Sequence, residues 1–250
     1  GDIYFDEYEG LYSISEERFI TEKEAESGIF KDIKKIKEKN YFFKMSAYQQ
    51  KLIEHIKQNP DFILPDYRKN EVLGFLNKPL NDLCISRPKS RLKWGIELPF
   101  DEDYVTYVWF DALINYISSI GYSNSNEKFR KFWPANIHLI GKDILTTHCV
   151  YWPTMLMSIG LDLPKTIFAH GWWLNKDSKM SKSVGNVINP LDLIDEFDED
   201  SLRFFLMRDM KLGQDSNFSE ESFITRYNSD LANDLGNLLS RITNLINKFF

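Results

Sequence analysis

The spacing of hydrophobic and polar positions changes at about residue 85. Residues 1–14 alternate aromatic with acidic side chains, as strands do, and residues 31–40 form a lysine-rich segment that we expect to be solvated. After residue 85, apolar runs are separated by amphipathic stretches of helix length, which is typical of strands and helices that alternate around a parallel sheet. The pattern predicts a small mixed module followed by an α/β domain.

One helix is predicted within the first region, from Ser46 to Asn59-Pro60. Ser46 can cap its start, and Asn59-Pro60 ends it because a residue before proline avoids the helical conformation. The apolar face of this helix contains Tyr48, Leu52, Ile53 and Ile56.

Two candidate strands lie at the centre of the second region. Residues 136–141 read as a buried strand that leads into a helix over residues 143–160, and residues 165–171 read as a second strand. Residues 172–190 follow as a polar loop. Because ligands bind at the carboxyl ends of strands in an open α/β sheet, we expect this loop to lie at the ligand-binding edge.

Further helices are predicted on both sides of this centre. Residues 106–121 form a helix that ends at Gly121, residues 201–210 are also helical, and residues 224–250 form a longer helical segment. The apolar positions assigned to the first of these are Val105, Val108, Trp109, Ala112, Tyr116 and Ile117. The last segment carries one apolar stripe, made of Leu231, Leu235, Leu238, Leu239, Ile242, Leu245, Ile246 and Phe249. This stripe requires partner helices that the sequence does not contain.

Composition excludes several classes of protein. The 250 residues are 27% charged with a net charge of −6, so the chain is globular and any RNA contact must use local basic patches. Cys84 and Cys149 form no Cys-x-x-Cys pair, which argues against a disulfide framework and a cysteine-based zinc site. No apolar run is long enough to span a membrane. We expect a reducing compartment, the cytoplasm, which the sequence does not distinguish from an organelle.

Lysine and serine are concentrated in the loop after the second strand. Lys179 and Lys182 offer positive charge, Ser181 and Ser183 offer hydroxyls, and Gly185 lets the backbone approach a phosphate. By composition alone, a solvated surface turn is the more common explanation of such a loop. The string Lys-Met-Ser-Lys-Ser that begins at Lys179 is, however, the lysine signature of class I aminoacyl-tRNA synthetases.

Nearly the whole chain resembles methionyl-tRNA synthetases. The matching stretches are YVWFDALINYI, HLIGKDILTTHCVYWP, FAHGWWLNKDSKMSKSVGNVINP, DSLRFFLMRDM and RYNSDLANDLGNLLSRI. The resemblance implies an α/β fold in which residues 1–84 are a connective segment, residues 85–222 are the second half of a Rossmann-type catalytic domain, and residues 223–250 begin an anticodon-binding helical domain. It also implies ATP with Mg²⁺, L-methionine and tRNA(Met) as ligands.

Two features of the family's pattern are missing. None of the histidines lies in a His-Ile-Gly-His setting, so we expect the first half of the catalytic fold to lie upstream of Gly1, and no activity without it. Some members carry zinc knuckles in the connective segment, whereas residues 19–43 contain no cysteine. We therefore expect no zinc in this chain.

The resemblance implies an ATP site that includes the lysine loop. Because adenylate formation requires neutralisation of charge on the phosphate oxygens, Lys182 is expected to be the main transition-state cation, assisted by Lys179. Met180 and Ser181 belong to the same loop. Further ATP contacts are expected from Gly141, Asp143, His170, Gly171 and Trp172. Without the resemblance, Asp143 could equally be only a helix cap.

Two groups at helical spacing are candidates for a methionine pocket. One group is Ile144, His148 and Trp152, and the other is Trp109, Ala112, Leu113 and Tyr116. By pattern alone, an ordinary core and a satisfied core histidine are the more common explanations. The resemblance implies that these residues contact methionine and that His148 forms a hydrogen bond with Tyr116, although several members have proline in place of Leu113.

Three other residues match family positions. Arg87 corresponds to an arginine near the active site. Asn237 and Arg241 lie one turn apart, away from the leucine stripe, and the resemblance implies that they read anticodon bases, although solubility alone would explain them. Two alternatives stay open: a non-catalytic tRNA-binding or assembly module derived from a synthetase, and a generic α/β nucleotide-binding protein, which would leave the helix with Asn237 and Arg241 unexplained.

Overall fold

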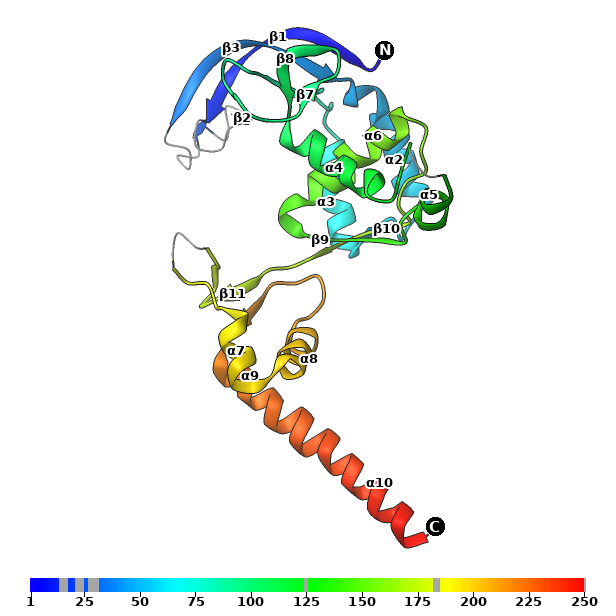
Figure 1. The fold of residues 1–250 in the computed structure, drawn as a ribbon, viewed down its shortest axis with the longest axis vertical. Helices are drawn as coiled ribbons and strands as arrows, with labels where there is room; N and C mark the ends of the chain where they lie inside the picture. Colours follow the sequence, from blue (N-terminus) through cyan, green and yellow to red (C-terminus); the bar gives the residue numbers. More distant parts are fainter. Residues whose placement is uncertain (14–17, 21–24, 27–31, 124–125, 182–184, 250) are drawn as a thin grey trace. The chain divides into compact units, whose positions relative to one another are not determined.

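The computed structural model describes residues 1–13, 18–20, 25–26, 32–123, 126–181 and 185–249. The chain divides into two compact units, which can be followed along the colours of Figure 1. The first consists of Gly1–His138 and Leu145–Ile167, and the second of Leu139–Ile144 and Phe168–Phe250. Helices and strands occur in both units, so the predicted α/β class is confirmed.

A four-stranded sheet forms the N-terminal part of the first unit, with the strand order β2-β1-β3-β5. Its strands are β1 (Ile3–Ser13), β2 (Arg18–Ile20), β3 (Ile33–Phe43) and β5 (Leu83–Cys84). β1 and β3 are antiparallel and paired along their full lengths.

The lysine-rich stretch expected to be a solvated segment is largely part of β3, and its described lysine side chains are exposed. Alternation explains why. Lys35 and Lys37 point to the same side of the strand, where their ammonium groups lie 2.8 and 2.9 Å from the carboxylates of Glu9 and Glu7 on β1. Such diagonal pairs of opposite charge stabilise antiparallel strands while the side chains stay exposed.

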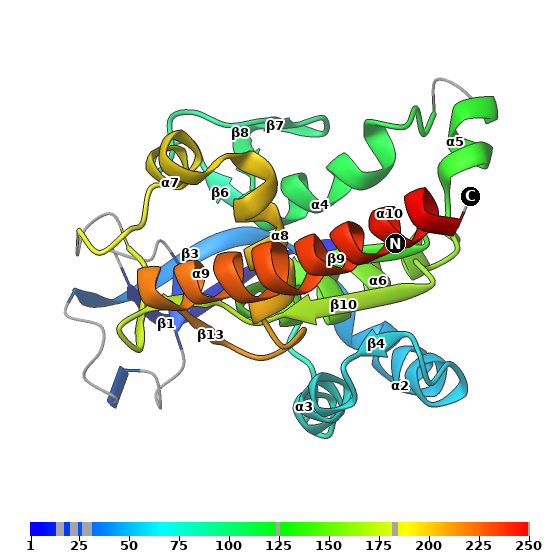
Figure 2. The ribbon, with the colours of Figure 1, turned by 90° about the horizontal axis from the view of Figure 1, so that it is seen from below.

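Helices follow this sheet in the first unit. They are η1 (Met45–Tyr48), α2 (Gln49–Gln58) and α3 (Asp66–Leu76), and Figure 2 shows α2 and α3 beside the short β4 (Ile63–Leu64). Leu52 and Ile56 of α2 are buried, as the apolar spacing predicts. Ser46 does not cap α2, because a 3₁₀ turn precedes the helix and the Ser46 hydroxyl donates to Oδ1 of Asp82 at 2.6 Å.

A second small sheet precedes the helix that carries Trp109. Its strands are β6 (Ser86–Pro88), β7 (Glu97–Leu98) and β8 (Asp101–Thr106), in the order β6-β8-β7. Val105 belongs to β8, where it pairs with Arg87, and not to the helix as expected. The helix is α4 (Val108–Ser118), which buries Leu113 and Ile117; α5 (Asn126–Phe132) follows it.

Both strands predicted at the centre of the α/β region are present. β9 (Ile137–Gly141) and β10 (Thr166–His170) form a sheet with the order β4-β10-β9. β9 is buried on one side only: His138 and Ile140 are buried, whereas Ile137 and Leu139 are 61% and 66% exposed. The single helix expected between the strands is divided into a 3₁₀ turn, η2 (Lys142–Ile144), a π-helix, η3 (Thr147–Tyr151), and α6 (Trp152–Ser158).

The second unit combines a small sheet with a helical core. The strands are β11 (Trp173–Asn175), β12 (Ser178–Lys179) and β13 (Ser216–Phe218), in the order β12-β11-β13. The helices are α7 (Pro190–Phe197), α8 (Glu199–Asp209) and α9 (Glu220–Arg226). Leu202, Phe205 and Phe223 form the buried core, and Trp173 and Phe218 pack against it.

The C-terminal helical segment leaves its apolar stripe uncovered. α9 leads through the π-helix η4 (Tyr227–Leu235) into α10 (Gly236–Phe249), as Figure 2 shows from below. The stripe residues from Leu235 to Phe249 are 46–66% exposed. No helix within the described residues covers this part of the stripe.

Candidate functional site

The ends of β9 and β10 meet closely in the second unit, and two glycines allow it. A Cβ atom at Gly141 would lie 2.5 Å from Oδ1 of Asp143 and 4.0 Å from Cε1 of His170. A Cβ atom at Gly171 would lie 2.1 Å from the carbonyl oxygen of Gln214. At Gly171 the neighbour is backbone, which excludes any larger side chain, whereas at Gly141 a side chain would displace the carboxylate of Asp143. The two strand ends and the residues that follow them form one compact edge.

Trp172 is the centre of this edge. Its backbone N–H donates to Oδ1 of Asp215 at 2.9 Å, and its indole Nε1 donates to Oδ1 of Asp143 at 3.3 Å. The ammonium groups of Lys142 and Lys179 each lie 4.1 Å from the centre of the indole ring, and Lys142 also pairs with Asp215 at 2.6 Å. We name these five residues the Trp172 group.

The Trp172 group contains residues predicted from the sequence and residues that were missed. The sequence singled out Asp143, Trp172 and Lys179, and the structure brings these three together. It also adds Lys142 and Asp215. Lys142 could have been noticed from its place between Gly141 and Asp143, whereas no periodicity or motif in the chain signals Asp215.

His170 and the lysine loop lie beside this group in the second unit. Nδ1 of His170 donates to the carbonyl oxygen of Gly171 at 2.7 Å, which fixes the ring at the end of β10. The backbone N–H of Ser181 donates to Oδ1 of Asn186 at 2.8 Å, and Nδ2 of Asn186 donates to the carbonyl oxygen of Lys179 at 3.1 Å. Asn186 therefore holds the described part of the loop, including Met180. Lys182 and Ser183 lie outside the described residues.

A tight hairpin carries Lys179. β11 and β12 pair around Lys176 and Asp177, whose φ angles of 50° and 60° are those of a two-residue hairpin turn. Left-handed backbone is unusual for residues other than glycine, and a polar side chain that bonds locally makes it tolerable. Here the backbone N–H of Asp177 donates to Oδ1 of Asn217 on β13 at 2.8 Å. The tip of the hairpin is thus attached to the rest of its sheet.

A second set of predicted residues gathers in the first unit. Oη of Tyr116 lies 2.8 Å from Nε2 of His148, which confirms the predicted hydrogen bond. The ring centres of Tyr116 and Trp152 are 5.9 Å apart. His148 and Trp152 are only 3% and 1% exposed, and burial raises the pKa of the Tyr116 hydroxyl. Three of the residues proposed for methionine therefore form one packed cluster.

The remaining members of the predicted pocket differ in their surroundings. Leu113 is buried on α4, Trp109 is partly exposed, and Ala112 is exposed. Ile144 belongs to η2 in the second unit. The structure thus joins Tyr116, His148 and Trp152 by direct contacts, and the roles of the other four residues stay predictions.

His138 lies within the same cluster, and no pattern in the sequence indicates it. Its ring centre is 4.3 Å from that of Tyr116, and its Nε2 accepts a hydrogen bond from Nε1 of Trp152 at 3.2 Å. Burial, followed by the proximity of His148, lowers the pKa of His138 to about 4. The residue is therefore neutral at physiological pH.

Arg87 is buried next to two cavities of the first unit. Its Nη1 donates to the carbonyl oxygen of Ser86 at 2.7 Å and to Sγ of Cys84 at 3.1 Å, and its guanidinium lies 4.8 Å from the ring centre of Tyr107. The two cavities have volumes of about 620 and 1110 Å³, and the larger one is also lined by Trp109. The position of Arg87 is fixed by these contacts, and its role stays a prediction.

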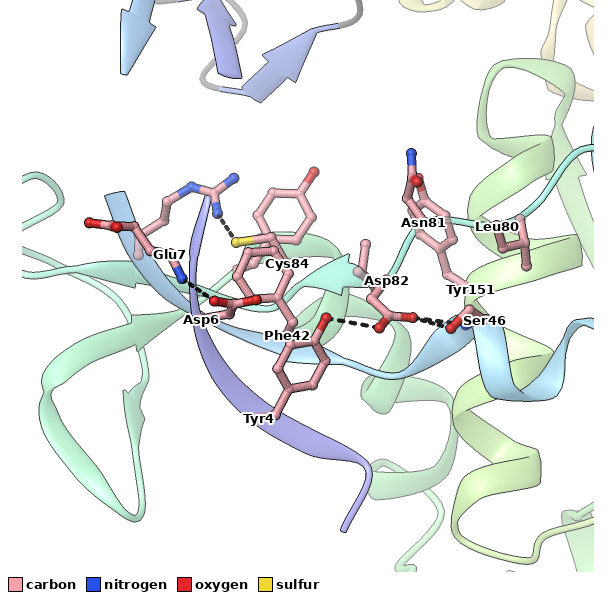
Figure 3. Close-up of a pocket in the computed structure, with 13 residues that line it drawn as sticks. Tyr4, Asp6, Glu7, Phe42, Ser46, Leu80, Asn81, Asp82, Cys84 and Tyr151 are labelled. Atoms are coloured by element: carbon pink, nitrogen blue, oxygen red, sulfur yellow. Dashed lines mark hydrogen bonds between the residues drawn. The ribbon is translucent and has the colours of Figure 1, made fainter. Parts of the chain in front are cut away.

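The smaller cavity is lined by three acidic residues, Asp6, Glu7 and Asp82. Figure 3 shows Tyr4 and Ser46 pointing toward Asp82, to which their hydroxyl groups donate at 2.9 and 2.6 Å. Burial and then the hydrogen bond to Asp82 raise the pKa of Tyr4 to about 12. Cys84 lines the same cavity, and burial raises the pKa of its thiol despite the nearby Arg87.

The two residues predicted to read anticodon bases lie on the C-terminal helix. Asn237 and Arg241 are exposed on α10. Among the described side chains, no group of three or more His, Cys, Asp or Glu is arranged to hold a metal ion. Of the helices in the described part of the chain, none has the length and apolar character needed to cross a bilayer.

Comparison with known proteins connects these sites to a family. The family described as tRNA synthetases class I (M) matches residues 21–243. Methionine–tRNA ligases of Clostridium perfringens and Listeria monocytogenes are 52% and 47% identical over the whole chain, which covers 39% and 40% of their lengths. The crystal structure of Mycobacterium tuberculosis methionyl-tRNA synthetase bound by methionyl-adenylate matches with a TM-score of 0.87 and 46% identity, over 96% of this chain and 48% of that one. The chain spans about two fifths of the length of these curated relatives, and it belongs to the methionyl-tRNA synthetase family of class I tRNA synthetases.

Proposed function

We propose that this chain is the part of a methionine–tRNA ligase that holds methionine and ATP during formation of methionyl-adenylate, before the methionyl group is transferred to tRNA(Met). The observation that carries the proposal is the Trp172 group, an aromatic ring with two lysines and two carboxylates at the ends of β9 and β10. This is the edge at which open α/β sheets bind nucleotides. The relatives are about two and a half times as long as this chain, so the activity is proposed for a protein of that length.

ATP is the ligand whose chemistry suits the Trp172 group. The indole of Trp172, with His170 and Gly171, offers a flat apolar surface for adenine. Asp143 can accept hydrogen bonds from ribose hydroxyls, and Gly141 lets the backbone come close. Lys179 carries a positive charge on a hairpin beside this surface, where it can approach the phosphates together with Lys182, Met180 and Ser181 of the loop. Mg²⁺ would enter with ATP as part of the substrate.

Charge neutralisation is the catalytic contribution expected from the loop. Attack of the methionine carboxylate on the α-phosphorus moves negative charge onto the phosphate oxygens and the departing pyrophosphate. Lysines that approach only at that stage stabilise the transition state more than the bound substrates, and so raise kcat. We assign this role chiefly to Lys182, with Lys179 as its assistant.

Methionine is proposed to bind beside the packed cluster of Tyr116, His148 and Trp152. A thioether forms only weak contacts with aromatic rings, of about 0.3–1.5 kcal/mol each, so several rings are needed to select it. The cluster supplies aromatic faces and one hydrogen-bonded histidine near the place of the sulfur. Trp109, Ala112, Leu113 and Ile144 are proposed to complete the pocket, and Arg87 to support it.

The ends of the chain are assigned to other tasks. Residues 1–84 are proposed to be a connective segment without zinc, residues 85–222 the second half of the catalytic domain, and residues 223–250 the start of the anticodon-binding domain. The exposed Asn237 and Arg241 would then contact unstacked anticodon bases. We expect the protein to work in the cytoplasm.

The proposal is tested by methionine-dependent exchange of pyrophosphate into ATP, measured with the full-length protein that contains these residues. We expect exchange that requires L-methionine and that Lys182→Ala slows by roughly 100- to 1,000-fold. A folded full-length protein that binds tRNA(Met) without exchange would favour the second candidate, a non-catalytic tRNA-binding module. The lysine signature and the assembled Trp172 group argue against that candidate, because neither is needed for binding tRNA alone.

A further inference from the structure

His138 contacts two of the residues proposed to bind methionine. It lies on β9, is 6% exposed, and belongs to the first unit together with Tyr116, His148 and Trp152. The proposed function assigns it no role. Its contacts are a hydrogen bond with Trp152 and close packing against the tilted ring of Tyr116.

The hydrogen bond from Trp152 defines the state of the His138 ring. An indole N–H is only a donor, so Nε2 of His138, at 3.2 Å, must be the acceptor, and the ring must be neutral with its proton on Nδ1. The indole of tryptophan can turn about its second side-chain torsion between broad, roughly two-fold alternatives. Only one of these directs Nε1 at His138. The acceptor therefore selects the orientation in which Trp152 presents its ring.

The ring of Tyr116 also packs against His138. Its ring centre lies 4.3 Å from that of His138, with an angle of 33° between the ring planes. This position leaves Oη of Tyr116 at 2.8 Å from Nε2 of His148. A side chain without a flat ring at residue 138 would leave space into which Tyr116 could shift, and the Tyr116–His148 hydrogen bond would lengthen.

Trp133 packs against two members of this arrangement. Trp133 has its ring centre 6.1 Å from His138 and 6.0 Å from Trp152. Its own indole N–H donates to the carbonyl oxygen of Asp162 at 3.0 Å, so its position is defined independently of the other rings. Trp133 therefore packs against His138 and also against Trp152, one of the two residues that His138 supports.

We infer that His138 is a positioning residue for selection of the methionine side chain, which acts by orienting Trp152 through its Nε2 and by supporting Tyr116 under His148. This inference rests on the proposed function. It requires both properties of the imidazole, the flat ring and the acceptor atom, and neither phenylalanine nor glutamine supplies both.

Two substitutions separate these properties. His138→Phe keeps a ring and removes the acceptor, whereas His138→Gln keeps an acceptor and removes the ring. In the full-length protein, we expect His138→Phe to raise the KM for methionine about tenfold and to reduce discrimination against norleucine, which has a methylene in place of the sulfur. We expect a rise of about threefold for His138→Gln. The KM for ATP should stay within about twofold in both variants.

A spectroscopic measurement follows the same contact without turnover. With ¹⁵N-labelled tryptophan, the indole N–H signal of Trp152 can be assigned by its loss in Trp152→Phe. We expect this signal to move upfield and to exchange faster with solvent in His138→Phe, because the hydrogen bond is gone, and to stay near its original position in His138→Gln.

His55 provides a matched control in the same unit. It is a partly buried histidine of α2 whose ring packs edge-on against Phe62 at 4.6 Å. His55→Phe should leave the KM for methionine, the discrimination against norleucine and the Trp152 signal unchanged. A general effect of replacing a histidine by phenylalanine would instead appear in both variants.

The outcomes distinguish this inference from the proposed function. If the wild-type protein shows no methionine-dependent exchange, the proposed function is wrong and the inference falls with it. If exchange is normal but His138→Phe changes neither KM, or changes those for methionine and ATP equally, only the inference is wrong. Should His138→Phe fail to fold, His138→Gln decides alone, and an unchanged KM for methionine in that variant overturns the inference.

Discussion

The two candidate sites differ in how firmly their side chains are held. In the first unit, His138, His148 and Trp152 are at most 6% exposed and are joined by ring contacts and hydrogen bonds. In the second unit, Asp143 and Lys179 are exposed, and Trp172 is only partly covered. One site is closed and built from packed rings, and the other is open and charged.

The proposed ligands explain this difference. A thioether makes weak contacts, so a pocket that selects it must be shaped in advance, and the entropy of ordering its rings must be lost at folding and not at binding. Phosphates interact strongly with lysine. A lysine that is desolvated before its ligand arrives would be costly, and one that stays hydrated on a surface hairpin can move when charge develops.

The largest effect on activity is expected from a substitution at the charged site. Lys182→Ala should lower kcat for adenylate formation by roughly 100- to 1,000-fold and change the KM for methionine little, because the lysine acts in the transition state. Pyrophosphate exchange measures both constants. Lys211→Ala, which removes an exposed lysine of the same unit, serves as the control and should be silent. Equal effects of Lys182→Ala on kcat and on the KM for methionine would contradict the assignment.

A smaller effect, of the opposite kind, is expected at the closed site. His148→Ala should raise the KM for methionine about thirtyfold and leave the KM for ATP unchanged, because the cluster loses the imidazole of His148 and the Tyr116 hydroxyl loses its partner. Tyr116→Phe, which removes only the hydroxyl, should cost less. Far-UV circular dichroism of the variant should match the wild type. Loss of that signal would mean that His148 stabilises the fold and does not select the ligand.

The closed site should also respond to pH through its stability. The folded-state pKa of His138 is about 4, below the ordinary value of 6.5, so the unfolded chain binds more protons between these values. Stability should therefore fall as the pH falls from about 6.5 to 4, and His138 should contribute about 1–2 kcal/mol of this loss at pH 4.5.

Urea unfolding at pH 7 and at pH 4.5 tests this expectation. The loss of free energy of unfolding should be smaller in His138→Gln than in the wild type by the contribution of His138. His55, whose pKa burial also lowers, titrates in both proteins and cancels in the comparison. The same pH dependence in both proteins would mean that His138 is not held neutral by its surroundings.

The smallest effect is expected from the support of Trp172. Asp215→Ala removes the partner of Lys142 and the acceptor of the Trp172 backbone N–H, and should raise the KM for ATP about fivefold without affecting that for methionine. Asp215→Asn keeps an acceptor and should fall between this variant and the wild type. Asp195→Ala, an exposed carboxylate of α7, is the control. An effect on the KM for methionine alone would contradict the proposal that the Trp172 group binds ATP and the Tyr116, His148 and Trp152 cluster binds methionine.

Sequence reasoning found the parts of the fold that local patterns determine. The strands that end at Gly141 and His170 were predicted because apolar runs between helices identify them. The burial of Leu52 and Ile56 followed from their spacing. The Tyr116–His148 hydrogen bond came from the family resemblance, and the spacing of the residues is only compatible with it.

Residues that act through distant partners could not be predicted in this way. Asp215 reaches Lys142 across 73 positions of sequence, and neither residue carries a pattern that indicates the other. His138 looked like an ordinary strand residue because its importance comes from the rings packed against it. Val105 was assigned to the helix because its spacing fits, but its pairing with Arg87 in the sheet decides its conformation.

The π-helix at Thr147–Tyr151 makes the position of His148 depend on the number of residues in this segment. Its backbone hydrogen bonds span five residues, so this turn accommodates one residue more than a regular helical turn would. Deleting that residue would let the helix close into a more regular and more strongly bonded form. Because the π turn absorbs that residue, the segments on either side would keep their places, and the change would fall on the turn itself, which carries His148. A more regular helix here would therefore change the position of the histidine that pairs with Tyr116.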